Sequence, residues 1–158
     1  MFTSLGTAYA LLGAVIAVAL AGAGSAIGLQ ISGTAQAGVL SVNPKLFSKT
    51  VVIQVLPATQ GIYGMVVAFL AFLNTGIMSG TPADYNVETG MAVLLVCLGI
   101  GVGGLVSAIF QGKAAAGWIN AISKKSELSG RSLIVVGMIE TYALLSFVIS
   151  LLAVIGIK

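Results

Sequence analysis

The sequence has little charge and no histidine. Only 7% of its 158 residues are charged, whereas roughly a quarter are charged in a soluble domain. This low charge excludes a soluble globular protein, and the 58% apolar content excludes a disordered chain. Because histidine is absent, the chain lacks the commonest metal ligand and the usual acid–base group at neutral pH. Its single cysteine, Cys97, excludes an internal disulfide framework.

Long apolar runs are what the sequence has in place of charge. A membrane-spanning helix needs about 20 mostly apolar residues. The runs of that length cover about 7–33, 50–75, 89–112 and 131–156. The first and third are expected to continue as helix to about residues 40 and 122. The sequence therefore predicts an all-α membrane protein with four transmembrane helices.

The two halves of the sequence resemble one another. A shift of 82 positions places Ser25-Ala26-Ile27 on Ser107-Ala108-Ile109 and Thr59 on Thr141, without a gap. We interpret the chain as two duplicated transmembrane hairpins. The predicted hairpins comprise residues 1–76 and 77–158. Since each contains two spans, both have the same orientation in the membrane, as in a parallel repeat.

Basic residues gather near two of the three predicted loops. They are Lys45, Lys49, Lys124, Lys125 and Arg131. The middle loop instead carries Asp84 and Glu88. The positive-inside rule then places loops 41–49 and 123–130 in the cytoplasm, with both termini outside, although Lys158 is an exception. The alternative is that these are solvated loop charges with no binding role.

Glu140 is the acidic residue that lies deep in a predicted span. It is about ten residues into the last helix, or ~15 Å along its axis, which is near the middle of a ~30 Å hydrocarbon core. A charge at that depth costs at least ~2.5 kcal/mol on insertion scales. Glu140 is therefore a candidate functional residue. The alternative is a protonated glutamate in a structural hydrogen bond.

The second predicted helix offers polar neighbours for Glu140. Thr59, Gln60 and Tyr63 share one helical face, and Tyr63 could hydrogen-bond Glu140. Pro57 lacks an N–H, so a carbonyl near residues 53–56 loses its usual partner. In lipid this carbonyl must be satisfied by another group, and a cation is one way to do so. A simple proline kink is the alternative interpretation of Pro57.

Gln111 adds an amide from the third predicted helix. It continues a stripe of Gly99, Gly103 and Ser107 at four-residue spacing, a face suited to close helix contact. An ordinary interhelical hydrogen bond is the alternative role for this side chain. With Glu140 and the groups of the second helix, Gln111 completes an all-oxygen ligand set that has one negative charge.

This ligand set favours a monovalent hard cation. Hard cations take oxygen ligands, and one carboxylate balances one positive charge. A proton would need only Glu140 and a single acceptor, so the additional oxygens favour Na+. In the repeat, Glu140 aligns with Ala58, which predicts one ion per chain.

Three motifs in these helices resemble a known family. The runs Leu56–Tyr63, Gln111-Gly112-Lys113 and Glu140-Thr141-Tyr142 are similar to those of the rotor-ring proteolipid (c or K subunit) of V-type ATPases, in particular the sodium-translocating bacterial members. The chain departs from the expected pattern at Ala58, which stands where a glycine follows the proline. This small change should not remove a ligand.

The resemblance implies a homo-oligomeric ring that turns against a static membrane subunit. That subunit would carry an essential arginine, and central-stalk subunits would contact the cytoplasmic loops. The resemblance also implies that Tyr63 hydrogen-bonds the carboxylate. The Na+ ligands that it implies are Glu140, Thr59, Gln60, Gln111 and the backbone carbonyl of Leu56.

Other functions are compatible with the same residues. The nearest is a rotor that carries H+, followed by an independent small cation transporter or channel and by a structural membrane adaptor. No Gly-x-x-x-x-Gly-Lys-[Ser/Thr] motif occurs in the sequence. We therefore expect a non-catalytic subunit, with ATP hydrolysed elsewhere in a complex. No basic patch with aromatic residues indicates a nucleic-acid partner.

Overall fold

The chain folds into long helices. The computed structural model describes residues 4–157, so the first three residues of the predicted first hairpin, and Lys158, lie outside it. The described elements are α1 (Leu5–Val42), η1 (Pro44–Leu46), α2 (Phe47–Val55), η2 (Leu56–Ala58), α3 (Thr59–Asn74), α4 (Val87–Lys124), η3 (Ser126–Leu128) and α5 (Ser129–Gly156). Across residues 4–157 no strand occurs, and four helical segments are long and apolar enough to cross a membrane. The predicted all-α membrane architecture is confirmed.

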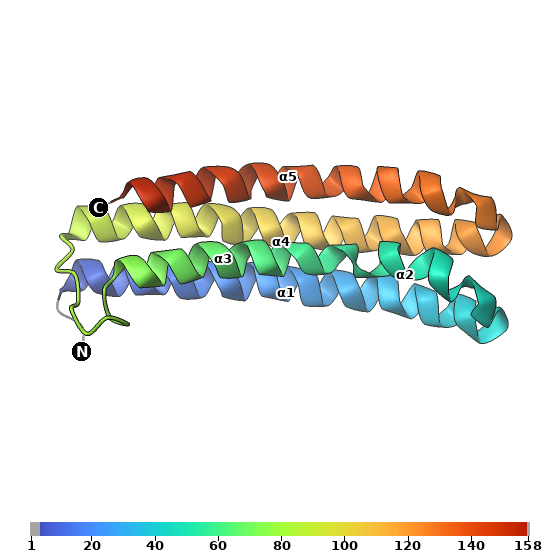
Figure 1. Cartoon of the computed structure of the whole chain (residues 1–158), viewed down its shortest axis with the longest axis horizontal. Coiled ribbons are helices and arrows are strands. Elements are labelled where there is room, and N and C mark those ends of the chain that lie inside the picture. Colours follow the sequence, from blue (N-terminus) through green and yellow to red (C-terminus); the bar gives the residue numbers. More distant parts are fainter. Residues whose placement is uncertain (1–3, 158) are drawn as a thin grey trace.

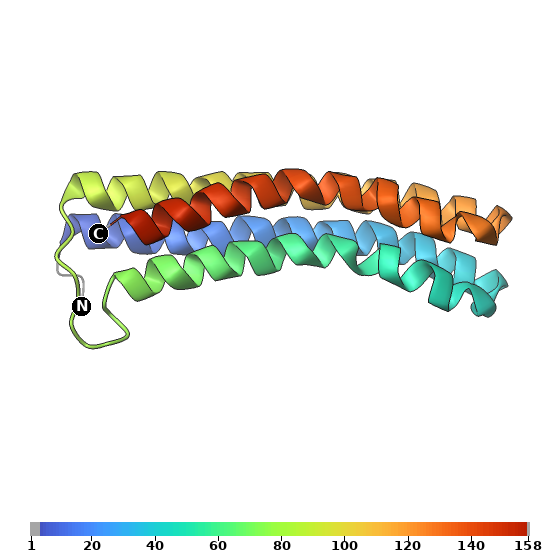
Figure 2. The same ribbon diagram turned by 45° about the horizontal axis from the view of Figure 1, so that its top comes forward.

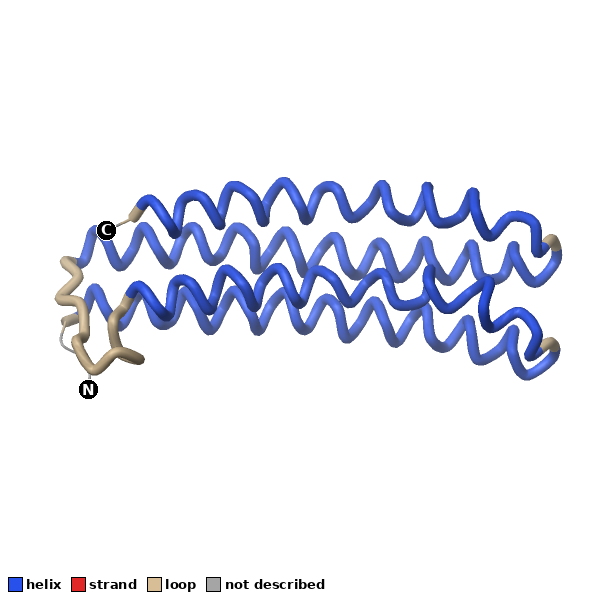
Figure 3. The backbone as a smooth tube through the Cα atoms, in the orientation of Figure 1, coloured by secondary structure: helices blue, strands red, loops and turns tan. Residues whose placement is uncertain are grey.

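The helices form a bundle of two hairpins (Figure 1). Helices α1 and α4 lie side by side and run in the same direction, and they make the most extensive contact in the bundle. Helix α3 packs on α1, and α5 packs on α4 (Figure 2), and α3 also contacts both α4 and α5. The connections that contain η1 and η3 lie at one end, and the long loop after α3 lies at the other (Figure 3).

Two helices exceed the thickness of a bilayer core. Each of α1 and α4 has 38 residues, which corresponds to ~57 Å at 1.5 Å per residue, against a hydrocarbon core of ~30 Å. Both begin with an N-cap side chain: Ser4 accepts a hydrogen bond from Thr7 N–H, and Asn86 accepts one from Thr89 N–H. The predicted continuation to about residues 40 and 122 agrees with the observed ends at Val42 and Lys124.

Glycines let α1 and α4 touch backbone to backbone. A Cβ added to Gly112 would lie 2.4 Å from the Gly28 carbonyl oxygen, and one added to Gly24 would lie 2.5 Å from Leu105 Cα. Neither contact is possible for a larger residue without a shift of the helices. The pairs 24 with 105 and 28 with 112 also place residues from equivalent levels of the two hairpins beside one another.

Pro57 divides the second helical rod. Helix α2 ends at Val55, a 3₁₀ turn covers Leu56–Ala58, and α3 begins at Thr59. Proline has no N–H with which to continue the α-helical pattern, and Leu56 O instead accepts from Thr59 N–H, three residues on. On the adjoining turn, Gln54 O accepts a hydrogen bond of 2.8 Å from Ser32 Oγ on α1.

The long loop ties the helices together at the end where it lies. Ser4 Oγ donates to Tyr85 O at 2.7 Å, and Tyr85 OH donates to Asn74 O at 2.9 Å. Asn74 Nδ2 in turn donates to Val154 O of α5 at 2.8 Å. Partial burial raises the pKa of Tyr85 further above its ordinary value near 10, and the protonated phenol donates to Asn74 O at neutral pH.

Candidate ion-binding site

Two buried amides cross the bundle at the level of the 3₁₀ turn. Gln60 on α3 and Gln111 on α4 are both fully buried. Gln60 Nε2 donates to Gln111 Oε1 at 2.7 Å, and Gln111 Nε2 donates to Val136 O at 3.1 Å. Buried polar groups are normally paired in this way. The two glutamines therefore link α3, α4 and α5.

The turn made by Pro57 brings three further oxygens together. Thr59 Oγ1 donates to Leu56 O at 3.0 Å and lies 3.3 Å from Gln60 Oε1. Thr59 and Leu56 are half-buried, whereas Pro57 is buried. A carbonyl, a hydroxyl and an amide oxygen are thus held within one turn of the chain.

Glu140 approaches this group from α5. It is half-buried, and its Oε1 accepts a hydrogen bond of 2.5 Å from Tyr63 OH on α3. The Tyr63 ring is stacked on Phe147, with ring centroids 5.0 Å apart. Val136, whose carbonyl holds Gln111, lies one helical turn before Glu140. Glu140 is therefore held by Tyr63, one turn from the carbonyl at which Gln111 reaches α5.

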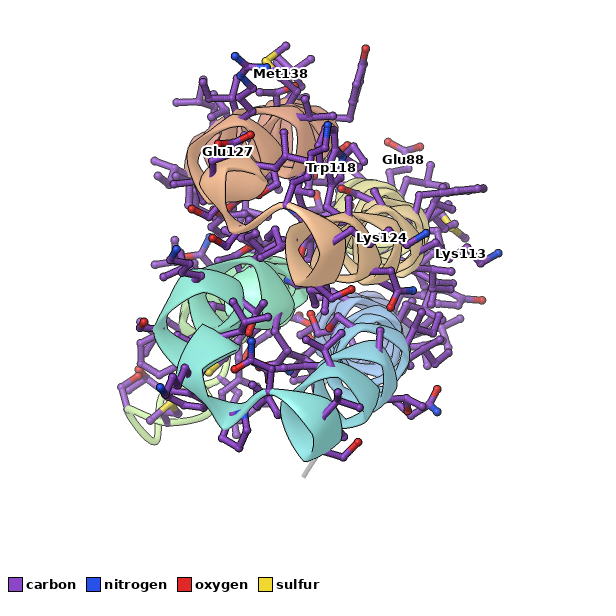
Figure 4. The ribbon with its side chains drawn as sticks, turned by 90° about the vertical axis from the view of Figure 1, so that its right-hand side faces the viewer. Glu88, Lys113, Trp118, Lys124, Glu127 and Met138 are labelled. Carbon is purple, nitrogen blue, oxygen red and sulfur yellow. The ribbon has the colours of Figure 1, made fainter. Side chains whose placement is uncertain are left out.

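Two sequence neighbours of Gln111 and Glu140 lie on the outside of the bundle, away from this group. Lys113, two residues after Gln111, is exposed, and its Nζ lies 5.3 Å from the centroid of the Phe110 ring. In Figure 4 its side chain points away from α5. Met138, two residues before Glu140, is 60% exposed and points outward from α5 (Figure 4). These neighbours mark the outer faces of α4 and α5.

Sequence reasoning missed two serines that support the site. Ser107 is buried, donates to Ile139 O at 3.1 Å and accepts from Gln60 Nε2 at 3.5 Å. Ser25 Oγ accepts from Gly61 N–H at 2.8 Å. The signal for Ser107 was its position one turn from Gln111 on the same face, where it was interpreted only as a small residue.

Comparison with known proteins identifies the family. The model of the ATP synthase C-subunit family matches residues 12–71 and 94–153, one range in each hairpin. The chain belongs to the ATP synthase C-subunit family. The resemblance to rotor-ring proteolipids that its motifs predicted is thus confirmed, and so is the architecture of paired transmembrane hairpins.

Two relatives within this group of ATPase proteins are similar along most of the chain. The V-type sodium ATPase subunit K of Enterococcus hirae is 41% identical over 151 residues, which are 96% of this chain and 93% of the relative. The A-type ATP synthase subunit K of Methanocaldococcus jannaschii is 34% identical over 145 residues, which are 92% of this chain and 61% of the relative.

Proposed function

We propose that this member of the C-subunit family is the rotor-ring protein of a V-type ATPase and that each chain carries one Na+. Membership of the family supports the rotor role, and similarity to a protein named V-type sodium ATPase subunit K supports Na+. Two hydrogen bonds carry the proposal. Gln60 on α3 bonds to Gln111 on α4, and one turn after Gln60 on α3, Tyr63 bonds to Glu140 on α5.

The proposed Na+ ligands are all oxygens. They are the Glu140 carboxylate, the Thr59 hydroxyl, the Gln60 and Gln111 amide oxygens and the Leu56 carbonyl. Each glutamine already uses its Nε2 to donate to another group, so its oxygen, which has two lone pairs, can face a cation. Pro57 supports the site by ending the helix at Leu56, and Tyr63 positions the carboxylate.

The single negative charge of Glu140 explains how the ion-loaded site can face lipid as the ring turns. With Na+ bound, the carboxylate is neutralised and the site can face hydrocarbon, whereas an empty ionised carboxylate is costly there. Moving each Na+ against 100 mV requires ~2.3 kcal/mol, which ATP hydrolysis elsewhere in the complex would supply. H+ is the competing coupling ion, and an independent small cation transporter is a more distant alternative.

The ring implies partners and an orientation. We propose a static membrane subunit whose arginine discharges Glu140, and central-stalk subunits at loops 41–49 and 123–130 on the cytoplasmic side, with both termini outside. We also propose that residues 1–76 and 77–158 are tandem repeats. Since Ala58 takes the place of Glu140 in the first repeat, one ion per chain follows.

Carbodiimide labelling tests the proposal. A hydrophobic carbodiimide attacks a protonated carboxyl in an apolar setting, so Glu140 should be the modified residue when the purified ring is labelled over a pH series and analysed by mass spectrometry. Millimolar Na+ should protect Glu140 at a pH where it otherwise reacts strongly. Glu127, which is exposed at the loop end, should stay unlabelled and is the internal control for the reagent's preference for an apolar setting.

The other outcomes separate the alternatives. Labelling of Glu140 that follows pH but ignores Na+ would establish the proton rotor. A Glu140 that never reacts while the ring is intact would contradict the buried-carboxylate site. A chain that does not form a ring in mild detergent would exclude the rotor role.

A further inference from the structure

Helix α1 supplies none of the proposed Na+ ligands, yet it lies along the whole of the second helical rod, from α2 through η2 to α3 (Figure 2). Two of its serines contact the backbone of that rod. Ser32 Oγ donates to Gln54 O at 2.8 Å, and Ser25 Oγ accepts from Gly61 N–H at 2.8 Å. Both serines are buried. One hydrogen bond therefore lies just before the 3₁₀ turn and the other just after it.

The spacing of these contacts fits an antiparallel hairpin. The two serines are seven residues apart on α1, which places them on one helical face, and the two backbone groups that they bond are also seven residues apart. Gly28 lies between the serines on that face, where an added Cβ would lie 2.7 Å from Pro57 Cβ. Because glycine has no side chain, the proline can pack directly on α1. Ser25, Gly28 and Ser32 thus form one surface against the turn, which we call the α1 support face.

Each serine meets a backbone group that the 3₁₀ turn leaves without its α-helical partner. In an α-helix Gln54 O would accept from Ala58 N–H, four residues on. Ala58 belongs to the turn, in which N–H groups donate three residues back. Gly61 is the third residue of α3, and the first N–H groups of a helix have no acceptor within it. Since lipid offers no replacement partner, the two serines stabilise the backbone on both sides of the turn.

The second hairpin lacks both the turn and most of this surface. The shift of 82 positions replaces three members of the contact: Gly28 by Phe110, Ser32 by Ala114 and Pro57 by Ile139. Of the α1 support face, Ser25 alone keeps its residue type there, as Ser107. Helix α5 continues through the corresponding level without a 3₁₀ turn. The glycine and the donating serine therefore occur in the hairpin that has the turn and are replaced in the hairpin that has none.

We propose that Ser25 and Ser32 are positioning residues of the ion site. Through the backbone of the turn they hold the Leu56 carbonyl and the Thr59 hydroxyl in place for Na+. Both of these ligand groups lie between the two backbone groups that the serines bond, so the segment is fixed on both sides. Groups that orient metal ligands reduce the ordering that binding requires. The inference rests on the proposed Na+ function and extends the site to α1.

Na+ protection of Glu140 from carbodiimide tests the role of Ser32. The Ser32→Ala ring should need about tenfold more Na+ than the parent for half-protection, as when other groups that orient metal ligands are removed. The pH for half-labelling in the absence of Na+ should stay that of the parent, because a proton on Glu140 does not use the Leu56 carbonyl. A general loosening of the bundle would not lower the Na+ affinity while leaving the proton affinity unchanged.

Ser150→Ala is the matched control. Ser150 is also buried, and its Oγ donates to Val96 O of α4 at 3.0 Å, so the variant removes the same kind of hydrogen bond between two helices. Ser150 follows Glu140 on α5 by ~15 Å along the helix axis, which places it well away from the turn. The Na+ concentration for half-protection and the pH for half-labelling should both stay at the values of the parent.

Unchanged Na+ protection in Ser32→Ala would overturn the positioning role and leave the proposed Na+ function standing. The role would also be overturned by an equal rise in the Na+ requirement of Ser150→Ala, or by a shift in the half-labelling pH of Ser32→Ala as large as its loss of Na+ affinity. If Ser32→Ala forms no ring in mild detergent, Ser25→Ala, on the other side of the turn, is held to the same outcomes. A parent ring in which Na+ does not protect Glu140 would refute the proposed Na+ function, and this inference with it.

Discussion

At the scale of single residues, Tyr63 is the side chain that joins Glu140 to the opposite helix. Its ring packs on Phe147 and its hydroxyl donates to the carboxylate. The ring contact and the hydrogen bond use different atoms, so a substitution can remove one and keep the other. The contribution of the hydroxyl to ion binding can therefore be measured without loss of packing.

Tyr63→Phe should weaken Na+ binding and leave the ring assembled. A hydrogen bond to a charged group contributes about 1.5–3 kcal/mol, and a change of about 1.4 kcal/mol in the free energy of binding changes the affinity tenfold. We therefore expect the Na+ concentration for half-protection of Glu140 to rise about tenfold or more. Tyr9→Phe, on α1 and far along the sequence from the site, is the matched control. An unchanged half-protection concentration in Tyr63→Phe would remove Tyr63 from the positioning role.

Residue types and helical spacing single out polar groups on α3, α4 and α5, but not the hydrogen bonds that connect them. Thr59 and Gln60 follow Pro57 directly, so the sequence places them beside the disturbed turn. The bond from Gln111 Nε2 to Val136 O depends on how α4 packs on α5, and a backbone acceptor leaves no mark in the sequence. The role of Ser107 escaped notice for the same reason, because its hydroxyl donates to the Ile139 carbonyl.

At the scale of elements, the glycines of α4 have opposite roles according to the face on which they lie. Gly112 faces α1, where an added Cβ would lie 2.4 Å from the Gly28 carbonyl oxygen. Gly117, on the same helix, has nothing within 4 Å of an added Cβ. Alanine stabilises a helix relative to glycine by up to ~1 kcal/mol. A glycine-to-alanine substitution should therefore stabilise the protein at position 117 and destabilise it at position 112, where the methyl group would clash.

Gly112→Ala should lower thermal stability in detergent, since α1 and α4 must separate to admit the methyl group. Gly117→Ala should leave stability unchanged or raise it slightly. Unfolding of the two purified variants, followed by circular dichroism on heating, makes the comparison. Equal stability of the two would mean that the helices are not in backbone contact at Gly28.

The ends of the helices can be predicted from the sequence where the chain is apolar, and less well where charged residues continue a helix beyond the hydrocarbon. The second and fourth apolar runs of the sequence begin near residues 50 and 131, whereas the corresponding helical spans begin earlier, at Pro44 and Ser126. The extra turns contain Lys45, Lys49 and Glu127, which lower the hydropathy without preventing a helix outside the hydrocarbon. Pro57 signalled a disturbed helix, but the form of the turn depends on which donors replace its missing N–H.

At the scale of the whole molecule, charge divides the two ends of the bundle. The end with η1 and η3 carries the clustered lysines and Arg131, whereas the other end carries Asp84 and Glu88. Ser41 and Ser79 are exposed, one at each end. They offer positions at which the proposed orientation can be tested without disturbing the helices.

Single cysteines at these serines should react from opposite sides of the membrane. In a Cys97→Ala chain, a membrane-impermeant maleimide should label Ser79→Cys in intact cells and Ser41→Cys only after the cells are permeabilised. The reason is the positive-inside rule applied to the basic loops. Labelling of Ser41→Cys in intact cells, with Ser79→Cys protected, would reverse the proposed orientation.

The single carboxylate shared by two hairpins sets how many ions the proposed rotor moves in each turn. With hairpins spaced evenly around the proposed ring, only every second one carries an ion, because Ala58 stands where Glu140 does. The angle turned per ion is then twice the angle between hairpins. Each ATP hydrolysed moves fewer ions than it would with a carboxylate on every hairpin, so each ion receives a larger share of the free energy. A rotor that moves fewer ions per ATP can pump them against a steeper gradient.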